Sequence, residues 1–149
     1  MIRPLEATDR VEWLRMRVAL WPVDDTIEEN ADEFYAGDSM VKQVFVHDLM
    51  EGRASGPALG GFIEIGERAY AEGCDTSPVA FIEGWYVDPD LRRAGTGAKL
   101  VAAAEVWARA QGYKEMGSDL LLGNDVSLRA HLALGFREVE RLIALAKRL

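Results

Sequence analysis

The residues of this 149-residue chain best suited to bind a charged ligand are Arg92-Arg93-Ala94-Gly95-Thr96-Gly97. Two glycines let a backbone turn approach a ligand closely, and the first amides of a following helix have no acceptor within that helix. Those amides and the positive end of the helix suit a pyrophosphate group, and Arg92 and Arg93 add full positive charge. The stretch therefore predicts an anion-binding turn.

The same six residues exclude two common nucleotide motifs. No Gly-Lys-Ser/Thr sequence follows, as a phosphate-binding P-loop requires, and the third glycine of a dinucleotide-binding fold is absent. A glycine-rich turn before a helix can also serve only as a turn. The spacing alone thus leaves a purely structural role open.

The order R-x-x-G-x-G, after an apolar run that ends in Gly84-Trp85-Tyr86-Val87-Asp88-Pro89, resembles the acetyl-coenzyme A signature of the GNAT (GCN5-related) N-acetyltransferases. A second signature of that family follows, in which Asn124, Ser127 and Gly135-Phe136 match and His131 stands where many relatives have tyrosine. This resemblance covers residues 79–136. It implies one acetyltransferase domain over residues 1–149, acetyl-CoA as co-substrate and no metal.

Longer stretches, at residues 75–84, 104–108, 115–119 and 134–140, look like the aminoglycoside 6'-N-acetyltransferases. This resemblance runs nearly end to end and implies transfer of an acetyl group to the 6'-amine of a cationic aminoglycoside, a reaction that gives antibiotic resistance. Relatives are commonly homodimers, and the same is expected here. Two alternatives remain: an acetyltransferase for another small polyamine or a peptide N-terminus, and a non-catalytic CoA-sensing module.

Acetyl transfer to an amine requires a proton acceptor, because an alkylammonium group has a pKa of about 9 to 10.4. Glu83 and Asp119 are the candidates by chain position, and His131 is the candidate for reprotonating the departing thiolate. No serine or cysteine with a paired base accompanies them, which favours direct transfer over a covalent enzyme intermediate.

The resemblance also assigns binding residues. Those expected to bind the cofactor are Trp85, Tyr86, Val87, Arg92, Arg93, Ala94, Gly95, Thr96, Gly97, Ala98 and Asn124. Those expected around the antibiotic are Trp21, Tyr70, Glu83, Asp119 and Glu140.

These residues need a scaffold, and the hydrophobic periodicity predicts a mixed α/β fold. Strands are expected over residues 2–5, 43–48, 59–69, 79–87 and 115–119, with one or two more over 138–146 and a turn at 51–57. Helices are expected over residues 10–20, from 27 onward, and over 98–111 and 126–134. A crossover helix makes the strands at 79–87 and 115–119 a central parallel pair in a mostly antiparallel sheet, and the ligand is expected where they diverge.

The two N-terminal helices carry specific expectations about packing. Val11, Leu14 and Val18 recur at helical spacing and predict the buried stripe of the first helix. Thr26 and Glu29 have the spacing of a capping box at the start of the second. Its inward face is expected to carry Ile27, Ala31, Phe34 and Tyr35, with the acidic residues of 24–33 outside.

Composition limits the possible partners. The chain has 17 basic and 25 acidic residues, a formal charge of −8, so a nucleic-acid partner is not expected and a cationic one is favoured. With 49% hydrophobic residues it can bury a core without metals or disulfides, and its single cysteine cannot form an intrachain bridge. No signal-peptide pattern or bilayer-length apolar run is present, which predicts a cytoplasmic protein with no membrane partner.

Overall fold

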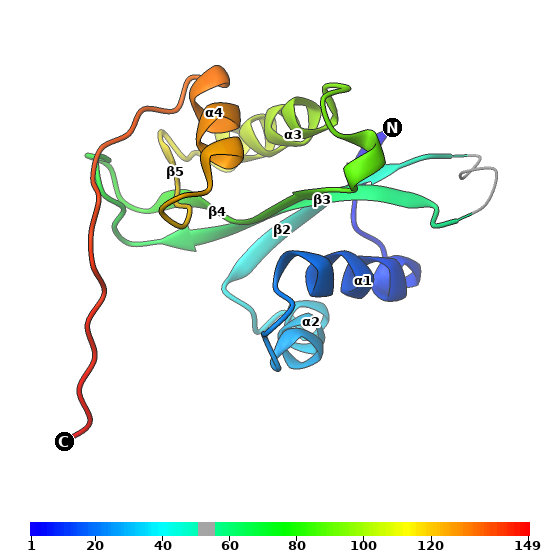
Figure 1. The fold of residues 1–149 in the computed structure, drawn as a ribbon, viewed down its shortest axis with the longest axis horizontal. Helices are drawn as coiled ribbons and strands as arrows, with labels where there is room; N and C mark the ends of the chain where they lie inside the picture. Colours follow the sequence, from blue (N-terminus) through cyan, green and yellow to red (C-terminus); the bar gives the residue numbers. More distant parts are fainter. Residues whose placement is uncertain (51–55) are drawn as a thin grey trace.

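Figure 1 shows the computed structural model, which describes residues 1–50 and 56–149. Five strands form one sheet in the order β1-β2-β3-β4-β5. Their bounds are β1 Ile2–Pro4, β2 Val41–Asp48, β3 Leu59–Arg68, β4 Val79–Val87 and β5 Met116–Ser118. Neighbouring strands from β1 to β4 are antiparallel, whereas β4 and β5 are parallel. The predicted fold class is thus confirmed, while most of the turn expected at 51–57 lies outside the described residues.

Helices cover both faces of the sheet. α1 (Arg10–Leu20) and α2 (Ile27–Ala36) lie on one face, and α3 (Thr96–Ala110) and α4 (Asp125–Ala133) lie on the other (Figure 1). Short 3-10 turns precede α1 at Ala7–Asp9 and follow β4 at Pro89–Leu91. Each face buries its own cluster of apolar side chains, one around Ile63, Ile82 and Leu100 and the other around Trp13 and Phe62. The sheet therefore separates two main cores.

The buried stripe predicted for α1 is wrong at Val11 and Val18, whereas Leu14 packs against the core as expected. Val11 is 75% exposed and Val18 is 52% exposed, whereas Trp13, Met16 and Arg17 are buried. Both sets have helical spacing, so periodicity does not distinguish them. The larger apolar area of Trp13 and Met16 favours the observed face, and Arg17 can be buried there because Glu64 on β3 lies within 3.0 Å.

The start of α2 also differs from expectation. Thr26 is the N-cap residue, but its side chain makes no capping hydrogen bond to the helix backbone. Instead its hydroxyl donates to Asp24 at 2.7 Å and accepts from the Asn30 side chain at 2.9 Å. The predicted capping box is therefore wrong. Ile27 and Ala31 are buried as expected, and Phe34 packs against the same core, while Tyr35 stays 36% exposed.

The strands expected over 138–146 are not formed. Residues 137–149 run as an extended segment away from the body of the fold (Figure 1), and every one of them is exposed. The segment keeps contact near its start, where Arg137 Nη2 donates to the Gly73 carbonyl at 2.9 Å. Its side chains include Leu142, Ile143 and Leu145, which are 59%, 84% and 91% exposed. An apolar strand sequence in this position has no sheet neighbour within its own described chain.

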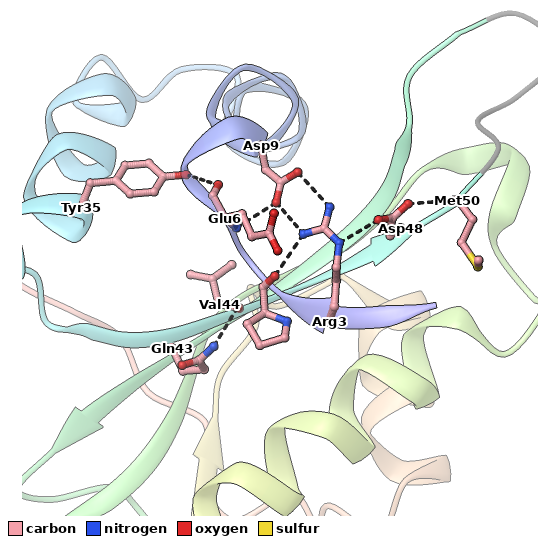
Figure 2. A network of polar contacts seen from close by, with 9 residues as sticks. Arg3, Glu6, Asp9, Tyr35, Gln43, Val44, Asp48 and Met50 are labelled. Atoms are coloured by element: carbon pink, nitrogen blue, oxygen red, sulfur yellow. Dashed lines mark hydrogen bonds and ion pairs between the residues drawn. The ribbon is translucent and has the colours of Figure 1, made fainter.

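An ion-pair network anchors the edge strand β1 to the rest of the sheet (Figure 2). Arg3 Nε donates to Asp48 Oδ2 at 2.7 Å, and its two terminal nitrogens donate to the Asp9 carboxylate at 2.7 and 3.0 Å. Asp9 also accepts the backbone amide of Glu6 at 2.8 Å. One arginine thus links β1, the end of β2 and the turn that begins α1.

No helix in the described part of the chain is long and apolar enough to cross a membrane. Within the same residues, no cluster of three or more histidine, cysteine, aspartate or glutamate side chains has the arrangement of a metal site.

Candidate active site

The candidate site begins where β4 and β5 separate. Their parallel pairing joins Ala80 to Met116 and ends with Ile82 opposite Ser118. Beyond that point β4 continues to Val87 with β3 on one side only, among the described residues. The outer backbone edge of residues 83–87 is therefore open to a ligand, as expected for diverging parallel strands.

A β-bulge lies at the same point on β4. The register with β3 pairs Glu64 with Gly84 and then Ile65 with Ile82, which leaves Glu83 as the extra residue. Bulges redirect side chains and commonly occur beside active sites. Here the bulge aims the Glu83 side chain along β3, so that a Cβ on Gly66 would come within 2.8 Å of its Oε1 atom.

The glycine turn connects the end of β4 to α3, as predicted. Arg93 and Gly95 both have left-handed backbones, with φ of 65° and 82°, and Gly95 is the N-cap of α3. A left-handed backbone favours glycine, and the free amides of the first helical turn follow directly. Thr96 is buried, whereas Arg93, Ala94 and Ala98 are exposed.

Arg92 has a structural contact in addition to its charge. Its Nε donates to the Val87 carbonyl at 2.9 Å, and its guanidinium lies 5.8 Å from the centre of the Tyr86 ring. Arg92 therefore satisfies the carbonyl of the last residue of β4, while its side chain remains exposed.

The β4 side chains expected to bind the cofactor point into the two cores. Trp85 and Val87 pack with the α3 cluster, while Tyr86 packs with the α1 cluster, where its ring stacks on Phe62 at 6.1 Å. Alternation of side chains along a strand places them on opposite faces. At this edge of β4, a ligand can therefore contact the backbone of residues 85–87 rather than their side chains.

Three residues of the second sequence signature belong to α4 (Asp125–Ala133) or cap it, namely Asn124, Ser127 and His131. Asn124 is its N-cap, and the side-chain oxygen accepts the Ser127 amide at 3.2 Å. His131 is buried, with Nδ1 at 2.8 Å from the Ser127 carbonyl and Nε2 at 2.8 Å from Ser118 Oγ. A carbonyl oxygen only accepts, so Nδ1 carries a proton; Nε2 then accepts from the serine hydroxyl in the neutral ring and donates to it in the imidazolium form. His131 thus reaches the point of strand divergence through Ser118.

A cavity of about 240 Å³ lies beneath the bulge, on the face covered by α1 and α2. It brings together two of the predicted site residues, Trp21 and Glu83. Trp21 packs over the bare backbone of Gly84, where a Cβ would come within 2.6 Å of the indole. The other lining residues are Trp13, Arg17, Asp24, Asn30, Glu33, Phe34, Ser39, Met40, Val41 and Glu64.

The remaining predicted residues lie outside this cavity. Tyr70 is 67% exposed just beyond β3, and Asp119 is exposed just beyond β5. Glu140 lies in the extended segment that leaves the fold. The cavity therefore contains only some of the residues expected to bind the antibiotic. Glu140 does not line the cavity of its own chain.

Sequence reasoning missed the arginines that neutralise the cavity acids. Arg17 Nε lies 3.0 Å from Glu64 Oε1, and its guanidinium stacks between Trp13 and Trp21 at 5.1 and 5.2 Å from their ring centres. Arg68 holds Glu83 through two hydrogen bonds of 3.0 and 2.8 Å. Opposite charges this far apart in sequence produce no periodic signal. The one general rule that predicts such partners is that a charged side chain is rarely buried unless an opposite charge pairs with it.

Comparison with known proteins agrees with this geometry. The profile of the acetyltransferase (GNAT) family matches residues 11–136. An aminoglycoside N(6')-acetyltransferase type 1 of Klebsiella aerogenes is 46% identical over 141 residues, which cover 93% of this chain and 90% of that protein.

Solved structures give the same result. AAC(6')-Iy, in complex with the bisubstrate analog CoA-S-monomethyl-acetylneamine, superposes with a TM-score of 0.85 at 34% identity, over 100% of this chain and 98% of that one. Aminoglycoside 6'-N-acetyltransferase AAC(6')-Ih of Acinetobacter baumannii superposes with a TM-score of 0.85 at 30% identity, over the same shares of the two chains.

The family expected from the two signatures is confirmed by matches that span nearly the whole chain. This chain belongs to the GNAT acetyltransferase family and, within it, to the aminoglycoside 6'-N-acetyltransferases.

Proposed function

We propose that this protein transfers the acetyl group of acetyl-CoA to the 6'-amine of an aminoglycoside antibiotic by direct attack, and so confers resistance. The observation that carries the proposal is the near full-length match, at 46% identity, to an enzyme named for that reaction. The open edge of β4 beside the glycine turn supplies the binding geometry that the reaction needs.

The glycine turn and strand β4 bind different parts of acetyl-CoA. Amides of residues 93–98 bind the pyrophosphate at the positive end of α3, and Arg92 and Arg93 add charge. The outer backbone edge of residues 85–87, where Arg92 already occupies the Val87 carbonyl, hydrogen-bonds the pantetheine arm and holds the thioester. Asn124 approaches the same arm from α4, and fixes the start of that helix through its capping bond.

The reaction forms a C–N bond to the thioester carbon and breaks its C–S bond. The attacking amine must be neutral, so Asp119 or Glu83 removes its proton directly or through a water molecule. Main-chain amides at the bulge stabilise the negative charge that develops on the carbonyl oxygen. The imidazolium form of His131, which carries a proton on each ring nitrogen, donates from Nε2 to Ser118 Oγ while the serine hydroxyl gives its own proton to the thiolate, which leaves His131 neutral.

Charge and aromatic surface account for the choice of substrate. Aminoglycosides carry several ammonium groups, for which Glu83 and the other acids of the cavity, together with Asp119 outside it, are suitable partners. Trp21 and Tyr70 provide aromatic faces that cover sugar rings and attract cations. The overall charge of −8 also favours collection of a polycation.

The direct test is release of free CoA thiol from acetyl-CoA with and without kanamycin, followed by NMR assignment of the acetylated nitrogen. The proposal requires thiol release that depends on kanamycin and a product acetylated at N6'. An acetyltransferase for another polyamine would release thiol with spermidine but not with kanamycin. A CoA-sensing module would bind CoA without turnover.

The assembly is proposed to be a homodimer that forms through residues 137–149. This extended, apolar segment adds a strand to the sheet of a second copy, beside β5, whose outer edge is open in the described chain. Glu140 then reaches the substrate site from the second copy. Sedimentation of the full chain and of a variant truncated after Phe136 tests this assembly, which requires a dimer only in the former.

The proposed location is the cytoplasm, because acetyl-CoA is available to the enzyme there. Fractionation of cells expressing the chain tests this location.

A further inference from the structure

Arg68, the last residue of β3, holds both oxygens of the Glu83 carboxylate. Its Nε donates to Oε1 at 3.0 Å and its Nη2 donates to Oε2 at 2.8 Å. The guanidinium carbon also lies 3.5 Å from the centre of the Phe81 ring. This planar, two-bond contact is the strongest form of arginine–carboxylate pairing. In the free protein, Glu83 therefore already has a cationic partner.

The backbone is shaped to allow this pairing. Glu83 is the bulged residue of β4, and its side chain lies across Gly66 on β3. A Cβ at residue 66 would come within 2.9 Å of the Glu83 Cγ atom, so any larger residue there would displace the carboxylate. Gly66 and Arg68 share one face of β3 because side chains alternate along a strand.

The guanidinium lies in the field of further acids. The hydrogen bond to Glu83 raises the pKa of Arg68 above its usual value; burial acts in the opposite direction, and the charges of Glu83, Asp119 and Glu72 add to the increase. Two of these carboxylates, Glu83 and Asp119, are the ones that the proposed function assigns to a substrate ammonium. Arg68 thus lies where a cation of the substrate would be expected.

We propose that Arg68 is a resident cation of the ammonium subsite, and that an aminoglycoside ammonium group displaces it from Glu83 on binding. The inference rests on the proposed function. The Arg68 side chain is 36% exposed and that of Glu83 is 15% exposed, so the arginine can turn outward while the acid stays in place. The exchange replaces one positive charge by another and leaves no bare carboxylate.

Displacement of Arg68 from Glu83 makes the site select polyamines over monoamines. A monoamine must compete with a two-bond ion pair through a single charge. A polyamine can contact Asp119 and the cavity acids at the same time, so its additional contacts offset the loss of the Arg68 pair. Arg68 would then favour polycationic substrates over simple amines.

Calorimetric titration with kanamycin tests the proposal directly. Arg68→Gln removes the competing charge, and the dissociation constant is expected to fall by about fivefold or more at low salt. Arg68→Lys keeps the charge without the two-bond geometry and is expected to give a smaller decrease. Should Arg68→Gln fail to fold, Arg68→Lys alone decides the direction.

Arg10→Gln is the matched control, since its side chain is 35% exposed, pairs with Asp32 and carries the same charge. It should change the dissociation constant by less than about twofold, which separates displacement from a general change in net charge. A double-mutant cycle adds a second control: in a Glu83→Gln background, Arg68→Gln should have a clearly smaller effect on binding than in the wild-type background, because the displaced ion pair is already absent.

An unchanged or larger dissociation constant in the Arg68 variants would overturn the proposal and make Arg68 a positioning residue for Glu83. A decrease of equal size in Arg10→Gln would overturn it as well. Failure of the proposed function has a different signature, because wild-type protein would then bind CoA but give no heat with kanamycin. That result would overturn both inferences.

Discussion

The indole of Trp85 lies directly against the backbone of Gly97, where a Cβ would come within 2.9 Å of the Cζ2 atom of the ring. The second glycine of the turn is therefore required by the packing of β4 against α3. Gly95 has the opposite situation: its φ is 82°, and within the described chain no atom outside its chain neighbours lies within 4 Å of a Cβ placed there. The two glycines of one motif serve different physical purposes.

Gly97→Ala is expected to destabilise the fold by about 1 to 3 kcal/mol, because the added methyl group forces the Trp85 ring to move. Chemical denaturation followed by tryptophan fluorescence measures this loss. Trp85→Phe in the same chain provides the space and should restore part of the stability. A double variant that is as unstable as the sum of the two single changes would show that the contact does not cause the loss.

Gly95→Val is expected to weaken CoA binding by at least about tenfold, since a left-handed backbone disfavours valine and the amides of the turn move with it. Gly37→Val is the matched control: Gly37 has a φ of 81° and an equally open Cβ position, but it ends α2. Calorimetry with CoA should show loss of affinity in the first variant only. Equal affinities in the two variants would remove Gly95 from the cofactor site.

Asp119→Asn is expected to lower kcat by about 10²-fold or more while the dissociation constant for CoA stays unchanged, as for loss of a general base. Steady-state kinetics with kanamycin across pH 6 to 9 provide the measurement. Asp75→Asn, in an exposed loop, removes the same charge and serves as control. A kcat in Asp119→Asn equal to that of the control would contradict the assigned role.

Sequence reasoning succeeded where the signal is local. The apolar residues of β2 and β3, the apolar run of β4 and the glycine turn before α3 each determine their element through neighbouring residues. The helix expected over 126–134 also has a local signal, because the Asn124 side chain caps it. These features depend on contacts within a few positions of the chain.

The predictions that failed depend on partners remote in sequence. Arg17, on the buried face of α1, contacts Glu64, which lies 47 residues later in the chain. The strands expected over 138–146 have the right composition, but a strand needs a neighbour, and this chain offers none to them among its described residues. Likewise the Arg68–Glu83 pair depends on a bulge that leaves no mark in the hydrophobic pattern.

The buried Glu64 predicts an unusual dependence of stability on pH. Its Oε1 accepts from Trp13 Nε1 at 3.0 Å and lies 3.0 Å from Arg17 Nε. Burial raises the pKa of Glu64 to about 7, although the charge of Arg17 acts in the opposite direction. Between pH 4.5 and 7 the folded state therefore holds a proton that the unfolded chain has released, so the free energy of unfolding decreases as pH rises through this window.

Glu64→Gln should remove this slope. The difference in unfolding free energy between wild type and variant is expected to change by about 3 kcal/mol across the window, as measured by urea denaturation at a series of pH values. Asp9→Asn is the contrasting control, because the hydrogen bond from Arg3 lowers the pKa of Asp9 (Figure 2). Its stabilisation is present above the usual aspartate pKa and is lost as pH falls below it. A slope that persists in Glu64→Gln between pH 4.5 and 7 would mean that another group titrates there and that Glu64 stays ionised beside Arg17.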